Sequence, residues 1–354
     1  MALSIKSLLE SWDGLGVVMR FDPPTGTWIF IALHNDTLGR PTGGTRIKVY
    51  QSAAAGLRDA MRLAEGMTHK WAAIDVGYGG GKAVLAIPRR LKRAEREGLL
   101  RRYGRLLTSL HGSFATGMDL GTTTEDMLII GEETEYVHGV DREKRRAVDP
   151  GPFTARGVFA SVRATLRRVF GSDQMAGRVI HVQGVGDVGA PLARMLNSAG
   201  AKLILTDLET RRAEQLADEL GNAETFEPHT AYQVPCDIYA PCAVGGTLNA
   251  ETIPSLKCRI VCGSANNQLD EPEDAVRLHT RGILYAPDFV VNAGGAAAFA
   301  LIGQGESDPD RIGARVDKIG ESLDTILDDA RTSNQSPVVA ARELVRRRIG
   351  LDGT

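Results

Sequence analysis

The stretch RVIHVQGVGDVG, residues 178–189, joins a short apolar run to three glycines at fixed spacing. Gly184, Gly186 and Gly189 form the pattern G-x-G-x-x-G, and a helical pattern of apolar residues follows as far as Gly200. Where such glycines join a strand to a helix, they permit a tight turn and let the backbone approach a pyrophosphate, which binds at the helix N-terminus. This stretch therefore predicts a Rossmann-type dinucleotide-binding domain.

The acidic residue after the next apolar run indicates which dinucleotide is bound. That run, AKLILTD, ends at Asp207, at about the distance from the glycines that the dinucleotide motif requires. A carboxylate here accepts hydrogen bonds from the ribose hydroxyls and repels a 2′-phosphate, which favours NAD over NADP. Arg211 and Arg212 follow it closely and leave NADP open. The predicted cofactor site also includes two residues inside the loop, Asp187 and Val188, and the charge of Asp187 there has no explanation from the sequence.

Apolar runs and helical patterns alternate on the C-terminal side of residue 150. The runs are RVIHVQ (178–183), AKLILTD (201–207), CDIYAP (236–241), RIVCGSA (259–265) and GILYAP (282–287). Helical patterns separate the first two pairs of these runs. This alternation is typical of a parallel sheet with crossover helices. Residues 151–329 are therefore predicted to form the doubly wound, α/β dinucleotide-binding domain.

The residues before 150 predict a second α/β domain. GTWIFIAL (26–33) and GGTRIKVY (43–50) have the composition of strands, and amphipathic helices are expected after Ser52 and over 91–112. The segment DPGPFTARG (149–157), with its prolines and glycines, is the predicted crossing between the domains. The tail, about 308–349, is predicted to be helical with a break at Pro337.

Composition and charge narrow the class of protein. The chain has 354 residues, which suits two domains, and a net charge of −2 with both signs mixed, so we expect neither nucleic acid nor a membrane surface as a partner. Residues 293–303 form a small-residue apolar run too short to span a bilayer. The four cysteines fit neither a disulfide framework nor a zinc site, so we expect no metal and a reducing, cytoplasmic setting. These cysteines are Cys236, Cys242, Cys258 and Cys262.

The stretch GYGGGKAV (77–84) places Lys82 after three glycines, but it is not a phosphate-binding P-loop. That motif needs a glycine five positions before its Gly-Lys pair and a Ser or Thr after the lysine, whereas Val76 and Ala83 stand at those positions. The lysine therefore needs another role. Glycines beside it would let a substrate and the backbone approach it closely.

Lys70, Lys82 and Asp119 are the candidate catalytic residues of the first domain. Two lysines in one cleft would repel each other, and burial would add to the effect, so we expect one of them to be a neutral amine near physiological pH. A neutral lysine can act as a general base beside a carboxylate that carries the proton. The other lysine, still charged, can bind a substrate carboxylate.

Eight further stretches occur in an order and at spacings typical of one enzyme family. They are GMTHK (66–70), GGGKAV (79–84), TGMDLGTTTEDM (116–127), PFTARGV (152–158), VQGVGDVG (182–189), DIYAPCAVGG (237–246), GSANNQL (263–269) and YAPDFVVNAGG (285–295). The chain resembles the amino acid dehydrogenases that include leucine, valine and phenylalanine dehydrogenase, with glutamate dehydrogenase more distant. The resemblance implies a homo-oligomeric enzyme that carries out reversible, NAD-dependent oxidative deamination of an L-amino acid to a 2-oxo acid and ammonia. It also implies that the C-terminal helices, about 330–354, pack on the first domain, 1–150.

Roles for single residues follow from the same resemblance. Lys82 would activate the water that attacks an imino intermediate, Asp119 would exchange protons with the amino group, and Lys70 would hold the substrate carboxylate. The remaining implied contacts are Asn292 and the backbone of Gly43 and Gly44 with the substrate, Thr154 with the nicotinamide carboxamide, and Asn266 with the cofactor ribose. The chain departs from the family at Trp71, where an Asn usually follows the first lysine, and at IDVGY (74–78).

The substrate side chain is expected to be apolar. Glutamate-specific relatives carry a lysine just before the Gly-Gly pair, and here that residue is Thr42. Gly117 and Ala296 stand where the leucine enzymes carry larger residues and should enlarge the pocket, whereas Phe299 should reduce it. An aromatic substrate is slightly favoured over leucine and valine. Two other functions remain open: a catalytically inactive dinucleotide-binding sensor or scaffold, and an oxidoreductase for another amine or a hydroxy acid.

Overall fold

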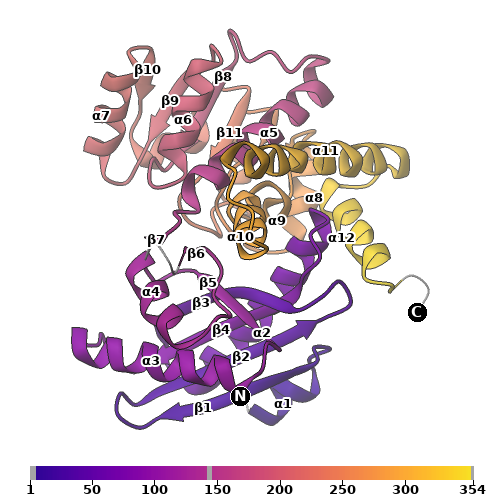
Figure 1. Cartoon of the computed structure of the whole chain (residues 1–354). Coiled ribbons are helices and arrows are strands. Elements are labelled where there is room, and N and C mark those ends of the chain that lie inside the picture. The colour runs from indigo at the N-terminus through magenta and orange to yellow at the C-terminus, as the bar shows by residue number, and fades with distance from the viewer. Residues whose placement is uncertain (1–4, 142–145, 352–354) are drawn as a thin grey trace. The chain divides into compact units, whose positions relative to one another are not determined.

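The computed structural model describes residues 5–141 and 146–351, and the chain divides into two units (Figure 1). The first consists of the described parts of Met1–Asp149, Phe299–Glu306 and Arg348–Thr354, and the second of Pro150–Ala298 and Ser307–Arg347. Each unit has its own sheet with helices on it, which confirms the predicted two-domain α/β fold.

The first unit is built around a mixed sheet in the order β1-β2-β4-β3-β5. β1 pairs antiparallel with β2, and β2 with β4, whereas β3 runs parallel to both β4 and β5. The strands are β1 (Gly16–Asp22), β2 (Thr27–Asn35), β3 (Pro41–Val49), β4 (Gly79–Ile87) and β5 (Ala115–Met118), and a separate hairpin-like pair is formed by β6 (Val140–Asp141) and β7 (Arg146–Ala147). The two predicted strands are β2 and β3, and the three glycines before Lys82 begin β4.

Helices cover both faces of this sheet. They are α1 (Ile5–Glu10), α2 (Ala53–Ala73), α3 (Arg93–Ser109) and α4 (Thr124–Glu133). The predicted cap, Ser52, accepts a hydrogen bond from the Ala55 amide at 3.2 Å and begins α2. Side chains along a strand alternate between the two faces of the sheet. On β4, Leu85 therefore packs against α3 on one face, and Val84 packs against α2 on the other. Lys82 has the parity of Val84, so its side chain is on the α2 face.

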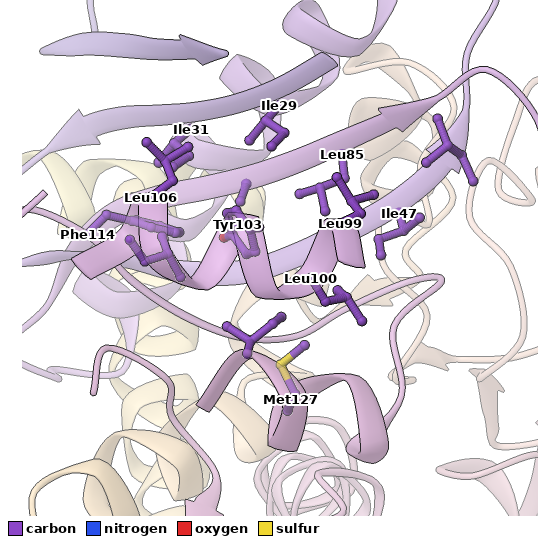
Figure 2. Packing of buried hydrophobic residues seen from close by; sticks show 14 residues of the cluster. Ile29, Ile31, Ile47, Leu85, Leu99, Leu100, Tyr103, Leu106, Phe114 and Met127 are labelled. Carbon is purple, nitrogen blue, oxygen red and sulfur yellow. The ribbon is translucent and has the colours of Figure 1, made fainter. Parts of the chain in front are cut away.

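The core under α3 holds β3, β4 and β5 in register (Figure 2). Leu99 and Tyr103 of α3 lie against the strands that carry Ile47 and Leu85, and Met127 of α4 packs on the other side of α3. The Tyr103 hydroxyl is fully buried and is satisfied by the hydroxyl of Thr45 at 2.8 Å. Full burial of each such apolar side chain stabilises the fold by about 1.5–3 kcal/mol.

The second unit contains a parallel sheet of six strands in the order β10-β9-β8-β11-β12-β13. In chain order this is 3-2-1-4-5-6, the arrangement of a doubly wound dinucleotide-binding fold. The strands are β8 (Val179–Gln183), β9 (Lys202–Thr206), β10 (Ala223–Thr225), β11 (Ile238–Pro241), β12 (Ile260–Val261) and β13 (Leu284–Tyr285). Five of them are the predicted apolar runs. The short edge strand β10, with two of its three residues exposed, carries no apolar run that could have predicted it.

The helices after residue 150 are α5 (Gly151–Phe170), α6 (Gly189–Ser198), α7 (Thr210–Leu220), α8 (Glu273–Thr280), α9 (Asp288–Val291), α10 (Gly294–Gly303), α11 (Pro309–Ser333) and α12 (Pro337–Arg348). The predicted crossing 149–157 contains the boundary between the two units, which falls between Asp149 and Pro150, and most of the segment is the start of α5. Pro150 and Pro152 are tolerated there because the first residues of a helix have no intrahelical partner for their amides.

The C-terminal helices differ from the expectation that residues 330–354 belong to the first domain. α11 packs along α5 (Figure 1), and Val338 of α12 joins a core cluster of the second unit with Val261 and Leu278. Only the segment from Arg348 onward belongs to the first unit, where the Arg348 guanidinium binds the carbonyls of Ala72 and Ala73 at 2.6 and 3.0 Å. Residues 352–354 lie outside the described part of the chain. Within the described residues, no helix is both long enough and apolar enough to cross a membrane.

Candidate active site

Lys82 lies in the middle of the first sheet and forms a buried ion pair. Its side chain is 5% exposed, and Nζ lies 2.8 Å from Oδ1 of Asp119, the residue that follows β5. The second carboxylate oxygen of Asp119 accepts a hydrogen bond from Nε of Arg46 on β3, also at 2.8 Å. The structure thus brings together two of the three predicted catalytic residues and adds an arginine that the sequence analysis did not single out.

The strand register explains why these side chains meet. On β3 and β5, Gly44 lies opposite Gly117 and Thr45 opposite Met118, so Arg46 comes next to Asp119. On β3 and β4, Thr42 lies opposite Gly80 and Thr45 opposite Ala83, which brings Gly44 beside Lys82. Lys82, Gly44 and Gly117 therefore form one row across three parallel strands. Two members of this row have no side chain, so the lysine stands beside a strip of bare backbone.

The pKa of Lys82 is lower than that of an ordinary lysine. Burial is the largest cause, the carboxylate of Asp119 opposes it, and the guanidinium of Arg46 lowers the pKa of Lys82 further. A lowering of the pKa by burial was predicted, and Arg46 is a cation near Lys82 that the sequence analysis did not single out. Lys70 itself is half-buried near the C-terminal end of α2.

Asp119 is held in the ionised form. Burial alone would raise its pKa, but the charges of Lys82 and Arg46 outweigh burial and hold the pKa of Asp119 well below its usual range. The pair is coupled: when Lys82 loses its proton, Asp119 loses the larger of its two stabilising charges and becomes a stronger base.

The glycines before Lys82 have a structural explanation that differs from the predicted access for a substrate. A Cβ at Gly79 would overlap the carbonyl of Asn35, one at Gly80 would overlap the Thr68 hydroxyl on α2, and one at Gly81 would lie 2.8 Å from the Phe114 ring. The protein's own atoms fill the space on all three, because α2 and the neighbouring loops pack directly on the β4 backbone. The glycines thus allow close packing around the lysine.

Gly43 and Gly44 are also required by packing. A Cβ at Gly43 would overlap the carbonyl oxygen of Gly81, and one at Gly44 would lie 2.7 Å from Cβ of Asp119. Any larger residue at position 44 would displace the side chain of Asp119. Thr42 precedes them with its side chain buried, and its hydroxyl donates to the carbonyl of Arg40 at 3.0 Å.

Trp71, the departure after the first lysine, is part of the support for this region. Its indole Nε1 donates to the carbonyl oxygen of Thr42 at 2.8 Å, and its side chain is buried. Its ring contacts Tyr78, which in turn contacts His138 edge-on, with centroid separations of 5.5 and 5.4 Å. Tyr78, from the second departing stretch IDVGY, thus packs against Trp71, the first departure. The hydrogen bond from Trp71 to Thr42 connects α2 to β3.

Gly117 and Phe299 lie together in the first unit. A Cβ added to Gly117 would be 3.6 Å from the Phe299 ring, and one added to Gly139 would be 2.9 Å from it. The ring therefore stands over two glycines, and the space that Gly117 leaves open is limited on one side by Phe299. The sequence predicted that Gly117 would enlarge the substrate pocket and that Phe299 would reduce it, and the two residues lie next to each other. Ala296 belongs to the second unit and is half-buried in α10.

The glycine-rich turn of the second unit has the form that a pyrophosphate requires. A Cβ at Gly184 would lie 2.7 Å from that of Ala243, and one at Gly189 would overlap the carbonyl of Gly184, so both serve tight packing. A Cβ at Gly186, by contrast, would meet no heavy atom of the described residues within 4 Å. The middle glycine thus exposes bare backbone at the start of α6, beside Val188, its N-cap, and next to the exposed Asp187.

Asp207 follows β9 and is fixed by two backbone amides. Its Oδ2 accepts from Val185 and its Oδ1 from Glu209, each at 2.9 Å. Each oxygen keeps a lone pair for a ribose hydroxyl. Arg212 is one of the two arginines that kept NADP as a possible cofactor in the sequence analysis. Its Nε lies 2.8 Å from Oε2 of Glu209, with which it forms an ion pair.

The other predicted ligand contacts in the second unit are partly engaged. The Thr154 hydroxyl donates to the carbonyl of Pro150 at 3.0 Å and accepts from the Gly295 amide at 3.2 Å, which leaves one lone pair for a carboxamide. Asn292 is buried, and its Nδ2 donates to Oδ1 of Asn266 at 2.9 Å. Among the described residues, none donates to the buried Oδ1 of Asn292. This oxygen can therefore accept a hydrogen bond from a water molecule or from a bound ligand.

Arg46 and its partner Asp59 are the residues that sequence reasoning missed. Arg46 lies inside the predicted strand GGTRIKVY (43–50), but nothing in the sequence places it beside Asp119. Its NH1 also contacts Oδ2 of Asp59 on α2 at 3.1 Å. In the described part of the chain, no group of three or more His, Cys, Asp and Glu side chains is arranged to hold a metal ion.

A mixed-sheet unit with a buried lysine–aspartate pair, joined to a doubly wound unit with a glycine-rich turn, defines a two-domain dehydrogenase. A family model described as Glu/Leu/Phe/Val dehydrogenase, dimerisation domain, matches residues 26–136, and the Glutamate/Leucine/Phenylalanine/Valine dehydrogenase model matches residues 204–344. The chain belongs to the Glu/Leu/Phe/Val dehydrogenase family. It is an L-amino acid dehydrogenase, an oxidoreductase acting on CH–NH₂ groups, which confirms the resemblance read from the sequence.

Similar proteins span nearly the whole chain. Leucine dehydrogenase of Bacillus cereus is 42% identical over 352 residues, which cover 99% of this chain and 94% of that protein. Phenylalanine dehydrogenase of Lysinibacillus sphaericus is 39% identical over 340 residues, with 94% and 88% covered. The crystal structure of L-tryptophan dehydrogenase from Nostoc punctiforme superimposes with a TM-score of 0.84 at 35% identity, over 98% of both chains.

Proposed function

We propose that the protein catalyses the reversible, NAD-dependent oxidative deamination of an apolar L-amino acid, aromatic or branched-chain, to the 2-oxo acid and ammonia. The observation that carries the proposal is the buried pair of Lys82 and Asp119 at 2.8 Å, in which burial lowers the pKa of the lysine. A base that works near neutral or mildly alkaline pH needs this environment, because an exposed lysine would stay protonated.

The proposed mechanism assigns a separate task to each residue. Bound NAD would accept the hydride from Cα of the substrate. Neutral Lys82 takes a proton from the water that attacks the resulting imino carbon. Asp119, a stronger base once Lys82 is neutral, carries a proton to and from the amino group, so that nitrogen leaves as ammonia. In the reverse direction the same two groups move the same protons.

The substrate contacts are proposed from the family, and the buried Oδ1 of Asn292, to which none of the described residues donates, supports one of them. Lys70 binds the substrate carboxylate as a charged amine, with the backbone of Gly43 and Gly44 nearby. The buried Oδ1 of Asn292 accepts a hydrogen bond from the substrate amino group. Thr42 in place of a lysine leaves a side-chain carboxylate without a counter-charge, which disfavours glutamate as a substrate.

The side-chain preference depends on Gly117, Ala296 and Phe299. We propose an aromatic substrate ahead of leucine or valine, because glycine at 117 and alanine at 296 leave room and Phe299 offers a ring for edge or face contact. One methylene changes discrimination by about 1–3 kcal/mol, so the preference is expected to be graded rather than absolute. The names of the similar leucine, phenylalanine and tryptophan dehydrogenases support this substrate class.

NAD is the proposed cofactor. The open backbone at Gly186, the packed glycines 184 and 189, and the α6 N-terminus with Asp187 and Val188 fit a pyrophosphate. Asp207 is proposed to bind the ribose of the adenosine half, Asn266 the other ribose, and Thr154 the carboxamide. Glu209 occupies Arg212, which disfavours a role for that arginine as a 2′-phosphate ligand.

We also propose that the chain forms a homo-oligomer. The first unit matches a dimerisation domain, and its sheet ends in the edge strand β1, whose outer backbone is available for pairing. Light scattering on the purified protein tests this proposal, and a monomer at micromolar concentration would reject it.

A spectrophotometric panel of the twenty L-amino acids with NAD and with NADP tests the catalytic proposal. NADH formation with an apolar amino acid, and ammonia-dependent NADH oxidation with the matching 2-oxo acid, are expected. Cofactor binding without turnover on any of them would favour the inactive sensor, and ammonia-independent NADH oxidation would favour a different oxidoreductase.

A further inference from the structure

Arg46 connects the Lys82–Asp119 pair to a second carboxylate on α2. Its Nε binds Oδ2 of Asp119 at 2.8 Å, and its NH1 binds Oδ2 of Asp59 at 3.1 Å. The side chains of Arg46 and Asp59 are only 14% and 16% exposed. The four groups form one chain of charges of alternating sign: Lys82, Asp119, Arg46 and Asp59.

Asp59 is itself fixed from two directions. The Tyr50 hydroxyl donates to its Oδ2 at 2.6 Å, and NH2 of Arg62 contacts its Oδ1 at 2.9 Å. Burial is the largest influence on Asp59 and would raise its pKa, but these hydrogen bonds and the charges of Arg46 and Arg62 lower the pKa of Asp59 below the usual value. Asp59 is therefore an anion that anchors the outer end of Arg46.

A guanidinium can make these two contacts at once because its donors lie in one plane and point in different directions. Arg46 uses Nε for one carboxylate and a terminal nitrogen for the other, a planar fork that a lysine does not possess. The contact directs Oδ2 of Asp119 toward Arg46 and leaves Oδ1 for Lys82. Removal of the fork would free the Asp119 carboxylate to rotate.

Lys82 is surrounded by charged groups from each neighbouring element. β3 contributes Arg46, the end of β5 contributes Asp119, and α2 carries Asp59 and Lys70. β2 carries His34, whose ring binds the Thr68 hydroxyl at 2.8 Å. Of these groups, Asp119 and Asp59 favour the charged lysine, and Arg46 disfavours it.

We propose that Arg46, anchored by Asp59, is a positioning residue that orients Asp119 and sets the pH above which Lys82 acts as a base. The proposal rests on the function proposed above, since it assumes that Lys82 is the base. Arg46 does not touch the reacting atoms and acts through Asp119 and through its charge. Nothing in the sequence distinguishes this role from that of a structural ion pair.

The charge effects of the two partners have opposite signs. Arg46→Gln removes a cation that disfavours protonated Lys82, so the pKa of Lys82 rises and the acid limb of the kcat/KM profile moves to higher pH. Asp59→Asn removes an anion that favours protonated Lys82 and leaves Arg46 less neutralised, so the acid limb moves to lower pH. Loss of structure alone would not move the limb in opposite directions.

The test compares pH profiles of the full-length enzyme and its variants with the same amino acid. Ionisation of the substrate amine is common to all of them, so differences between profiles report on the enzyme. Arg46→Lys keeps the charge but not the fork, so kcat should fall while the acid limb stays near its wild-type position. Asp59→Asn preserves side-chain size and supplies the test where Arg46→Gln is not recovered folded.

Arg96→Gln is the matched control. Arg96 makes a comparable two-contact pair with the buried Asp126, at 2.8 and 2.6 Å, in the same unit. Its loss should lower the thermal midpoint but leave the acid limb unchanged. Unmoved limbs, or limbs that move in the same direction, in Arg46→Gln and Asp59→Asn would overturn the proposal. Wild-type activity retained in Lys82→Ala would instead overturn the proposed function beneath it.

Discussion

The Nζ atom of Lys82 and Oδ1 of Asp119 are 2.8 Å apart, although the two residues come from the outer strands of a three-strand parallel set. β3 lies between them, and the contact crosses it only because residue 44 is a glycine. The pair is therefore a property of three strands together. Burial of Lys82 disfavours its protonated form and lowers its pKa, so that the neutral amine can act as a base.

Removal of the lysine should abolish turnover without loss of cofactor binding. Lys82→Ala is expected to lower kcat by several orders of magnitude, because a general base typically contributes about 10²–10⁴-fold and the buried Asp119 also loses its partner. NADH titration followed by fluorescence should give an unchanged Kd, since the glycine-rich turn belongs to the other unit. Lys48→Ala, an exposed lysine on β3, is the control. Near-normal turnover in Lys82→Ala would reject the base assignment.

The choice of cofactor should depend on Asp207. Asp207→Ser keeps an acceptor but removes the charge, so the affinity for NAD should fall and NADP should become usable, with a change in the ratio of kcat/KM values of tenfold or more for about 1.4 kcal/mol. Steady-state kinetics with both cofactors measures this. Glu214→Gln, at an exposed position on α7, should change the ratio little. Equal NAD preference in Asp207→Ser would contradict the ribose contact.

Substrate size should respond to Gly117. A Cβ at this position would meet the Phe299 ring at 3.6 Å, an ordinary contact, so Gly117→Ala should fold and lose one methyl volume of space. Its kcat/KM for phenylalanine should fall relative to that for valine by about 1–3 kcal/mol. Phe299→Leu should shift the same ratio the other way. A parallel loss on all substrates in Gly117→Ala would show that the residue supports the sheet rather than the side-chain site.

The indole of Trp71 should matter for stability. Trp71→Phe removes the donor to the Thr42 carbonyl, so a buried acceptor loses its partner at a cost of about 1–3 kcal/mol. Urea denaturation followed by circular dichroism measures the loss. Trp28→Phe, on the β2 strand and outside this contact, is the comparison. Equal stability of Trp71→Phe and wild type would mean that the hydrogen bond contributes nothing net.

One half-buried and one fully buried histidine should make the protein sensitive to mild acid. Burial lowers the pKa of His138 and of His181 to about 4 each, against 6.5 for an ordinary histidine. Below pH 6.5 the unfolded chain binds protons that the folded chain does not, so stability falls as pH drops from about 6.5 to 4, by about 3 kcal/mol at most for each. In His138→Gln and His181→Gln, the midpoint of urea unfolding should depend less on pH across this range. Exchange of the exposed His229 should not, and a flat wild-type profile would reject the prediction.

Much of the second unit was readable from the sequence because its signals are local. The run RVIHVQ, the three glycines and Asp207 lie within one strand–turn–helix–strand segment, whose chemistry needs few distant contacts. The strands around it were equally visible as apolar runs. The edge strand β10 was not predicted, because it has no apolar run that would mark it as a strand.

The sequence by itself determined that two lysines, an aspartate and a dinucleotide turn are present, since residue types and short spacings are written in the chain. Only the tertiary structure decided which cation stands beside Lys82. Arg46 on β3 lies next to Asp119 because of the register of β3 against β5, and Asp59 contacts Arg46 from α2. Register is set by side-chain packing on both faces of the sheet, which no local pattern records. The assignment of α11 and α12 to the second unit depends on packing in the same way.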